Sequence, residues 1–510
     1  MLHTLHKALK YVVVLVSAHI PYCNHPLPAG AAKETASIYI APKLPLGDTA
    51  RYVRLEIEMK KAIKPDFYFT DLPYDKNKGL MLMKDDASIT DYTMVLKILS
   101  GGVVNGKTYP GFTYTDGTGK KIGYKYSFAI NPNEGHTTDL ENVTSWDQIN
   151  QIIAKGHAFM NHSLFHGGTD KLKAIKDAEK NMWTHTHYRM TEIAVPSNDE
   201  GYVTSGLQLG YHLITSQFGE PVPDGNNDPG NQNISWGSFI PMTTQNFNKV
   251  LVSRYNLGDQ WNSAELKVSE NFIDEIFSGS NTGKKPIGAA FSHGPFKESK
   301  DAPDNFFAFL TYIQNHPGNH DSAWITSSKD LMNYEQTKAA VIVISKHYDA
   351  ATKKFIIILD MKNVDPNVVS RNLSLKITGG TISTVHGQGS NDITFNPLTG
   401  LINIYKTDRS KVIDPYQDAL PPQITSIVAK GKIILLLYDK PVTQSKIEGY
   451  DVPGNKVISL SGDGKTWQLH LLNTVQSPQT LFYRMQLGDA IQTGNHKMHV
   501  CNYAGQPIKF

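Results

Sequence analysis

The amino-acid sequence predicts a parallel α/β domain followed by one or two β-sandwich modules, because the spacing of its apolar residues changes near residue 339. Before that point, short apolar runs alternate with segments of helical periodicity, as in strand-then-helix units. After it, helical periodicity almost disappears, and apolar runs are separated by Gly, Asn and Asp turns. With 510 residues, the chain is long enough for about three domains.

The elements of the first region follow from local signals. Ser145 is a predicted helix cap, and Gly156 ends that helix. An Asp-Gly pair at residues 116–117 predicts a hairpin inside an insertion at residues 101–125. The predicted strands are residues 79–83, 126–130, 158–160, 286–291 and 323–325. The predicted helices are residues 90–99, 145–156, 171–183, 305–313 and 328–334.

The second region contains runs that are typical of strands. Paired prolines near residues 418–422 predict an extended linker, so we expect one module at 339–418 and another at 421–510. The predicted strands are residues 340–345, 354–360, 373–377, 431–438 and 466–471.

The first 31 residues have the pattern of an export signal. Lys7 and Lys10 precede an apolar run at residues 11–18, which is too short to span a bilayer. Cleavage would follow Ala18 or Ala31, and both alternatives stay open. We expect a periplasmic, cell-surface or extracellular protein without an integral membrane span.

Composition excludes two classes of function. The net charge is only +3 and no long Lys/Arg block occurs, so the sequence gives no support for nucleic-acid binding. With two cysteines in the whole chain, a Cys-based metal site is excluded. Composition does not indicate the oligomeric state.

Acidic and imidazole side chains follow three of the predicted strands. Asp85 and Asp86 follow the first, His162 and His166 follow the strand at 158–160, and His293 follows the strand at 286–291. In a parallel sheet the carboxyl ends of the strands lie at one edge, where active sites of α/β proteins form. We therefore expect these five side chains to converge.

The residue types at this edge suit a catalytic metal. A His-x3-His spacing places both imidazoles on one face of a helical turn, and two histidines with one carboxylate can hold a zinc-like ion. Asp86 would be that carboxylate, leaving Asp85 free as a general base and His293 as a proton donor. Zinc is the expected divalent ion, while cobalt or nickel would also fit.

Several segments resemble motifs of the polysaccharide deacetylases of carbohydrate esterase family four. Met-Lys-Asp-Asp-Ala at residues 83–87 resembles the family's Thr-Phe-Asp-Asp-Gly motif. Gly-His-Ala-Phe-Met-Asn-His-Ser-Leu-Phe-His at 156–166 resembles its histidine motif, and Phe-Ser-His at 291–293 its late Leu-x-His motif. The resemblance covers about residues 79–334.

This resemblance implies a distorted (β/α) barrel at residues 37–336 and a hydrolase that removes N- or O-linked acetyl groups from a glycan. It implies Asp85 as base, His293 as acid, and a metal on Asp86, His162 and His166. The family's third motif has an Arg that orients the base, but residues 192–201, which match that region, contain none. We expect the insertion at 101–125 to reshape the groove. The segment at 424–442 resembles bacterial Ig-like modules.

Two alternatives to a deacetylase remain at this point. The missing Arg favours a non-catalytic glycan-binding or surface protein on a deacetylase fold. The second alternative is a metal hydrolase that acts on another bond, such as a peptide amide. The sequence does not choose the glycan or the N- versus O-acetyl preference.

Overall fold

The computed structural model describes residues 51–217, 242–243, 251–278, 286–294, 300–408, 422–483, 488–493, 500 and 503–510. The expected export signal at residues 1–31 lies outside the described residues, as does most of the expected linker at 418–422. Among the helices that are described, none is both long enough and apolar enough to cross a membrane.

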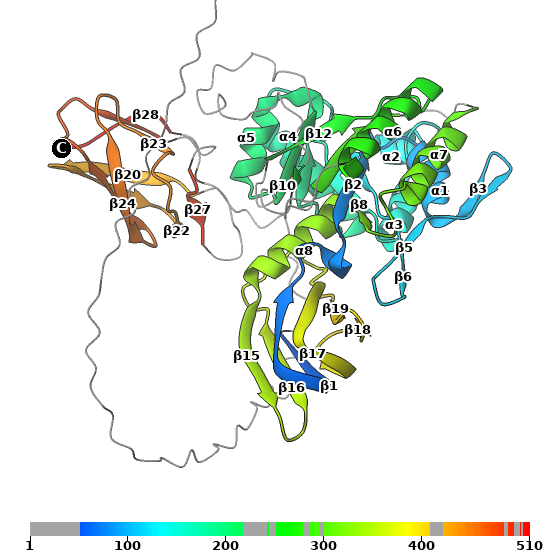
Figure 1. Cartoon of the computed structure of the whole chain (residues 1–510). Helices are drawn as coiled ribbons and strands as arrows, with labels where there is room; N and C mark the ends of the chain where they lie inside the picture. The colour runs from blue at the N-terminus through cyan, green and yellow to red at the C-terminus, as the bar shows by residue number, and fades with distance from the viewer. Residues whose placement is uncertain are drawn as a thin grey trace, which may run out of the picture. The chain divides into compact units, whose positions relative to one another are not determined.

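Parallel strands of the first region close into a barrel (Figure 1). In the described residues the order around the barrel is β13, β12, β10, β9, β8, β7 and β2, and β2 pairs back to β13. The strands are β2 (Lys78–Lys84), β7 (Ser127–Ile130), β8 (Ala158–Asn161), β9 (Glu192–Ala194), β10 (Leu213–Gln217), β12 (Leu251–Asn256) and β13 (Pro286–Ser292). The parallel barrel implied by the motifs is therefore confirmed.

The barrel is irregular at β2, where two strands share one edge. β13 pairs along β2 from Gly79 to Lys84. On the other edge, β14 (Ala323–Thr326) pairs with the first half of β2, and β7 pairs only with Met83 and Lys84. A further strand, β11 (Met242–Thr243), is antiparallel to β13.

Helices connect the barrel strands and supply the outer layer. The Ser145 cap predicted for α3 is present as a capping box with Gln148, and Gly156 has a positive φ of 80° just after that helix. The predicted helix at 90–99 begins as a π-helix, η2 (Asp91–Leu96). The α-helices of this region are α1 (Lys97–Ser100), α2 (Gly135–Thr138), α3 (Trp146–Ala154), α4 (Lys171–Thr186), α5 (Glu200–Gln208), α6 (Ser263–Ser278), α7 (Ala302–Asn315) and α8 (Ser328–Ala340).

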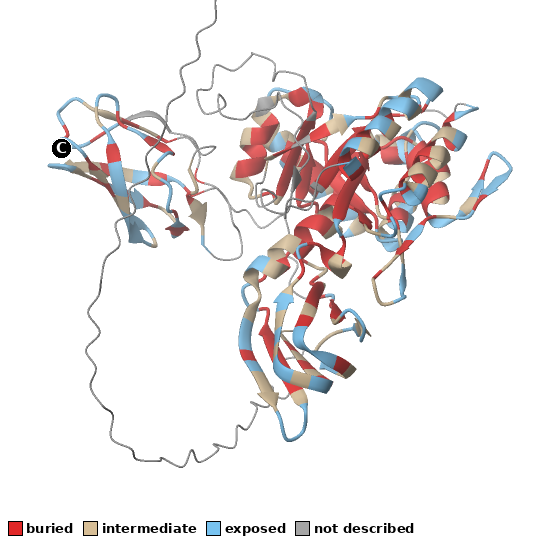
Figure 2. Cartoon of the chain, viewed as in Figure 1, coloured by how far each residue is buried: buried red, intermediate tan, exposed pale blue. Residues whose placement is uncertain are grey.

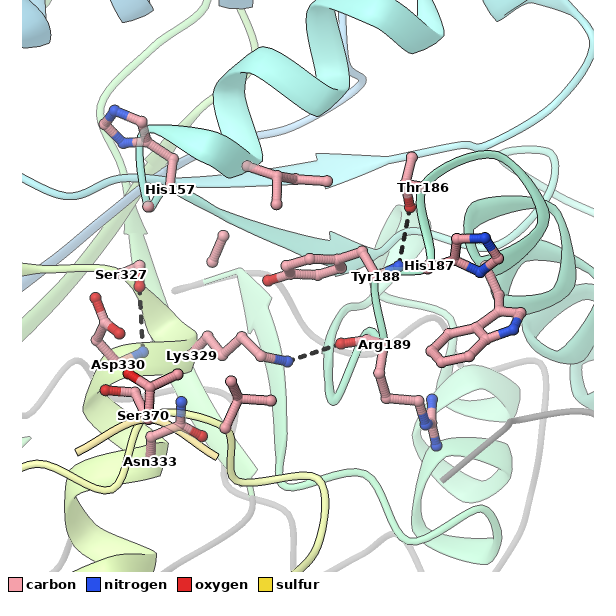
Figure 3. A pocket seen from close by; sticks show the side chains of 16 residues that line it. His157, Thr186, His187, Tyr188, Arg189, Ser327, Lys329, Asp330, Asn333 and Ser370 are labelled. Carbon is pink, nitrogen blue, oxygen red and sulfur yellow. Dashed lines mark hydrogen bonds between the residues drawn. The ribbon is translucent and has the colours of Figure 1, made fainter. Parts of the chain in front are cut away.

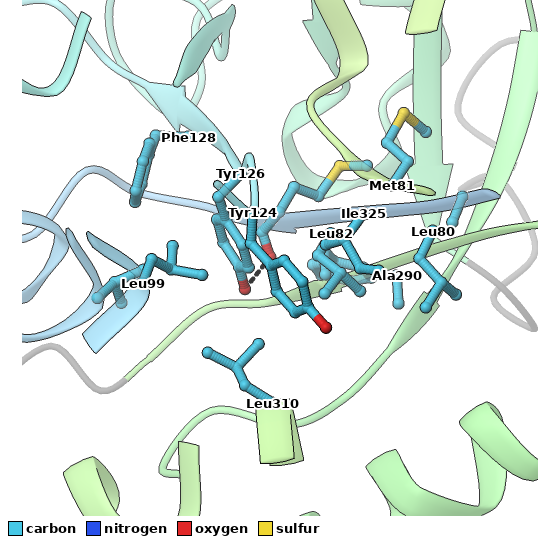
Figure 4. Close-up of a cluster of buried hydrophobic side chains, with 14 of the residues drawn as sticks. Leu80, Met81, Leu82, Leu99, Tyr124, Tyr126, Phe128, Ala290, Leu310 and Ile325 are labelled. Atoms are coloured by element: carbon cyan, nitrogen blue, oxygen red, sulfur yellow. Dashed lines mark hydrogen bonds between the residues drawn. The ribbon is translucent and has the colours of Figure 1, made fainter. Parts of the chain in front are cut away.

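The largest core lies around β2, all seven residues of which are buried. Leu80 and Leu82 lie on the side of the strand that faces Leu310 of α7, whereas Met81 lies on the other (Figure 4). Side chains alternate along a strand, so Lys84 shares the face of Leu80 and Leu82, and Asp85 shares the face of Met81. This alternation sends two successive polar residues to opposite sides of the same strand.

The strand β1 (Tyr52–Phe69) lies outside the barrel, which corrects the expected domain start at residue 37. It is a central strand of a six-stranded antiparallel sheet in the order β15, β16, β1, β17, β19 and β18. Buried and partly exposed residues alternate from Val53 to Met59, as expected for a sheet with one covered face. The partner strands are β15 (Ile342–Asp349), β16 (Lys354–Asp360), β17 (Leu373–Gln388), β18 (Asp392–Asn396) and β19 (Leu401–Tyr405).

The insertion at 101–125 forms two hairpins. The first contacts Asp304 in the first turn of α7 and the second lies at the amino ends of the barrel strands, so the expectation that the insertion reshapes the groove stays a prediction. Thr115 bonds to Asp321, which precedes β14, and Tyr74, which precedes β2, contacts Tyr114. The Asp116 carboxylate accepts hydrogen bonds from Thr394 and Tyr405 of the six-stranded sheet, at 2.6 and 2.8 Å. The hairpin strands are β3 (Gly102–Val104), β4 (Lys107–Tyr109), β5 (Thr113–Thr115) and β6 (Lys121–Gly123).

The described part of residues 422–510 is all-β. A four-stranded sheet is accompanied by small sheets of two and three strands. Apolar side chains such as Ile434, Leu436 and Leu469 are buried, and Figure 2 shows buried and exposed segments side by side in this part of the chain. The strands are β20 (Ile424–Lys430), β21 (Ile433–Tyr438), β22 (Val442–Thr443), β23 (Tyr450–Asp451), β24 (Val457–Asp463), β25 (Thr466–Leu471), β26 (Thr480–Tyr483), β27 (Ile491–Gln492) and β28 (Tyr503–Pro507). The all-β prediction is confirmed, and the Ig-like resemblance stays a prediction.

Candidate metal centre

Asp86, His162 and His166 meet at the carboxyl end of the barrel, as the sequence predicted. One ligand atom from each lies within 4.8 Å of the others. Nε2 of His162 is 3.4 Å from the Asp86 carboxylate and Nε2 of His166 is 3.9 Å from it. Two imidazole nitrogens and one carboxylate oxygen are a donor set for a catalytic divalent ion with an open position.

The ring of His162 is held in the orientation that a ligand needs. Its Nδ1 lies 2.7 Å from the carbonyl oxygen of Ala194 in β9, so Nδ1 carries the proton and donates it. The side chain is almost fully buried, and Nε2 has no hydrogen-bond partner. A buried nitrogen lone pair without a donor is costly in a folded protein, so it fits a metal ligand.

His166 is more exposed, and the chain after β9 supports it. Nδ1 of His166 lies 3.3 Å from the hydroxyl of Ser197. Ser197 belongs to η3 (Pro196–Asn198) and has a positive φ of 52°. Residues 192–201, matched at first to the family's third motif, therefore support both histidines: Ala194 through a carbonyl and Ser197 through a hydroxyl.

The loop that carries Asp86 has a strained backbone above a buried ion pair. Asp86 and Ala87 both have positive φ, at 72° and 40°. Lys84, which replaces the family's Phe, points to the other side of β2, and its ammonium lies 2.6 Å from Asp91 and 2.8 Å from the Ser88 hydroxyl. These contacts tie the two ends of the loop together, which helps to hold Asp86 in place.

An arginine that the sequence reasoning missed pairs with Asp85, so the expectation of a missing Arg is corrected. Arg254 on β12 binds both carboxylate oxygens of Asp85, at 2.7 and 2.6 Å. Both side chains are essentially fully buried, and the guanidinium also lies 4.0 Å from the centre of the Phe291 ring. A two-point contact of this kind fixes the plane of a carboxylate. The Arg thus comes from a different strand from the one expected.

His293 follows β13 and is oriented by another residue that the sequence reasoning missed. Its Nδ1 lies 2.8 Å from the carboxylate of Asp259, in the loop after β12, which leaves Nε2 for proton exchange. Gly294 is required by close approach, because a Cβ there would lie 1.3 Å from the carbonyl oxygen of Asp259. His293 is partly exposed, unlike Asp85 and His162.

Electrostatics keep the carboxylates of the site ionised at neutral pH. Burial tends to raise the pKa of Asp85, but Arg254, followed by His162 and His293, outweighs it and lowers that pKa. Burial acts likewise on Asp86, yet its interactions, mainly with His162, lower its pKa to about 2. Interactions with His162 and His293 lower the pKa values of both carboxylates, and His166 lies beside Asp86, so the structure brings together all five residues predicted from the sequence.

No family model matches the chain, and no curated protein matches it. Solved structures of carbohydrate esterase family four polysaccharide deacetylases do align with it. One is a putative polysaccharide deacetylase from Mycobacterium smegmatis, with 10% identity, 54% of this chain and 93% of that chain covered, and a TM-score of 0.33.

Two more of the similar solved structures are an esterase and a pseudoenzyme. A family 4 acetyl xylan esterase from Clostridium thermocellum, in complex with a cobalt ion, has 14% identity, a TM-score of 0.26 and 50% of this chain and 90% of that chain covered. A family pseudoenzyme from Bacillus anthracis has 12% identity, a TM-score of 0.27 and 51% and 66% covered. At these identities and TM-scores the similarity carries no argument about activity. Several of the solved structures to which this chain is similar are thus carbohydrate esterase family four deacetylases or a pseudoenzyme of that family.

Proposed function

We propose that this protein is a metal-dependent hydrolase that removes acetyl groups from a polysaccharide or oligosaccharide. The observation that carries the proposal is the convergence of Asp86, His162 and His166 beside the Asp85–Arg254 pair and His293. The acetylated-glycan part rests on the order and spacing of the family-like motifs in the sequence. We also propose that the protein is exported, because of its first 31 residues.

The donor set suits zinc, and cobalt or nickel would also fit it. When bound to Asp86, His162 and His166, such an ion would act as a Lewis acid and lower the pKa of nearby water to about 7. The position of the unpartnered Nε2 of His162 beside the Asp86 carboxylate supports this assignment, because a cation between them would satisfy both groups.

The remaining residues divide the proton transfers between them. Asp85 takes the proton of the attacking water, and each of its oxygens keeps a lone pair beyond the one used by Arg254. Arg254 holds the carboxylate in one plane throughout. His293 gives a proton to the leaving nitrogen or oxygen from Nε2, while Asp259 holds Nδ1 and stabilises the charged ring.

The non-catalytic alternative loses its main support. It was favoured by the absence of an arginine near the base, and Arg254 occupies that role from β12. The low pKa of Asp85, together with its two-point contact, describes a carboxylate that is ionised and oriented, as general-base catalysis requires.

The direct test is an acetate-release assay on fragments of acetylated chitin, peptidoglycan and xylan, with and without a chelator. We expect release from at least one substrate, loss on chelation, and recovery with added zinc or cobalt. Asp85→Asn should retain the metal but reduce the rate about 10²–10⁴-fold, because a positioned base contributes that much. Full activity in Asp85→Asn would remove the base assignment, and no release from any substrate by the metal-loaded protein would contradict the proposed function.

A further inference from the structure

A cavity of about 440 Å³ lies at the opposite end of the barrel from the metal centre (Figure 3). It is lined by residues 156–158 at the start of β8, by residues that precede β9, and by the first turns of α8. Ala158 and His162 lie at opposite ends of β8, about 13 Å apart at the usual rise of a strand. The proposed hydrolase reaction uses none of the residues that line this cavity.

One wall of the cavity contains a buried acceptor without a donor. The side-chain oxygen Oδ1 of Asn333 has no hydrogen-bond partner, although the residue is 2% exposed. Asp330 and Ser370 line the same wall, and Figure 3 places them beside Asn333. Buried polar groups are nearly always paired. Because Oδ1 of Asn333 has almost no accessible surface, a ligand at this wall would reach it after a small rotation of the amide and should present hydroxyl or N–H donors.

Two aromatic side chains, Tyr188 and half-buried Trp183, line the cavity, and the Lys329 ammonium lies over one face of Tyr188, 4.8 Å from the ring centre. The Tyr188 hydroxyl accepts a bond from the backbone N–H of Phe159, at 3.2 Å, so its own proton remains to be donated. Lys329 is part of the wall, because its ammonium donates to the carbonyl oxygen of Arg189 and to the Thr191 hydroxyl.

The charges around the cavity nearly cancel, which argues against an anionic ligand. Arg189 pairs with Glu179 at 2.6 Å, and Lys329 and Asp330 carry opposite charges. Burial, above all, lowers the pKa of His157 to about 3, so its ring is neutral. A phosphate or carboxylate would meet Asp330 without an unpaired cation to balance it.

We propose that this cavity is a second carbohydrate-binding site, which takes one or two neutral pyranose rings. A pyranose combines hydroxyl donors for Asn333 and Asp330 with a C–H face for Tyr188 and Trp183. The volume is within the range of small-molecule sites. The site would bind a glycan independently of the metal centre and would hold the polymer at the amino end of the barrel.

Calorimetric titration of the full chain with N,N′-diacetylchitobiose, xylobiose and inorganic phosphate tests this site. His162→Ala should keep the binding of at least one disaccharide, because it changes only the metal centre. Asn333→Leu should weaken that binding by about tenfold or more, which corresponds to about 1.4 kcal/mol. Its melting temperature should be unchanged or higher, since it removes an unpartnered buried polar group.

Two further variants complete the experiment. Trp183→Ala, at a half-buried position on α4, should also weaken disaccharide binding. Asn150→Leu, the same exchange as at Asn333 but on the exposed surface of α3, should leave it unchanged. Binding of phosphate but not of either disaccharide, no binding at all, or disaccharide binding that His162→Ala abolishes and Asn333→Leu retains would each overturn the proposal. None of these results depends on acetate release.

Discussion

The hairpin around Asp116 and the metal centre, at opposite ends of the barrel, treat buried polar groups in opposite ways. At the amino end, the Asp116 carboxylate is met by the hydroxyls of Thr394 and Tyr405, so the chain satisfies its own acceptor. At the carboxyl end, Nε2 of His162 is buried without a partner, and Asp86 lies in a strained loop. The contrast indicates that the Asp116 hairpin joins the barrel to the antiparallel sheet, while the metal centre is shaped for something that the chain does not supply.

The largest effect is expected when a proposed metal ligand is removed, because the metal centre then loses the feature that distinguishes it. His162→Ala should reduce bound metal to background and abolish acetate release, because the remaining His166 and Asp86 give only two donors. Metal content measured by inductively coupled plasma mass spectrometry checks this. His185→Ala, an exposed histidine on α4, is the control and should keep the metal. Unchanged metal content in His162→Ala would remove that residue from the ligand set.

The next largest effect should come from Arg254, which couples the site to the stability of the barrel. Arg254→Met leaves Asp85 buried without its partner, so we expect a loss of about 3–5 kcal/mol in unfolding free energy. Activity should fall about 10²-fold because the base is no longer held in place, while metal stays bound. Arg254→Lys should recover little, since an ammonium cannot make the two-point contact.

A matched control separates the two effects of the Arg254 exchange. Arg371 is another buried arginine and pairs with Asp408 at 3.0 Å, outside the barrel. Arg371→Met should lose comparable stability in chemical denaturation but keep the turnover of the folded enzyme. If both variants lose stability equally and neither loses turnover, Arg254 would be a structural residue only.

Arg254 also illustrates the limit of the sequence reasoning. Asp85, Asp86, His162, His166 and His293 were found because each follows a strand-like run, so a local signal marks its position. The Arg254–Asp85 pair joins residues 169 positions apart, and Asp259 reaches His293 from another loop. A charged residue within the run Leu-Val-Ser-Arg-Tyr-Asn at 251–256 was the available hint, because lone charges are rare in buried strands.

The fold also divides into features that local sequence patterns predict and features that depend on pairing between distant parts of the chain. The strand and helix types of the barrel follow from local patterns, including the capping box of α3. The place of β1 does not, because Tyr52 pairs with Asp360, more than 300 residues away. Its alternation of buried and exposed residues is a signal of an antiparallel strand, and such a strand is out of place in a parallel barrel.

A change at the amino end should affect stability without affecting chemistry. Asp116→Ala leaves the hydroxyls of Thr394 and Tyr405 without their acceptor, and we expect a loss of about 2–3 kcal/mol in unfolding free energy. The rate of acetate release and the metal content should be unchanged. Asp392→Ala, which breaks an exposed ion pair with Lys120 on the same hairpin, should cost at most about 1 kcal/mol. A large loss of turnover in Asp116→Ala would show that the two ends are coupled.

The smallest expected effect is on stability at acidic pH and comes from His157, which precedes β8. Burial, followed by the charges of Lys125 and Lys155, lowers its pKa to about 3, and its Nδ1 accepts a bond from the N–H of Tyr126. Between pH 6.5 and about 3 the unfolded chain binds a proton here that the folded chain does not, so stability falls as the pH falls. The slope should reach at most about 1.4 kcal/mol per pH unit, and His157→Gln should remove it. Chemical denaturation of both proteins at pH 7 and pH 5 measures the difference. If the two lose stability equally between these pH values, the folded protein tolerates a charged His157, and burial does not keep its ring neutral.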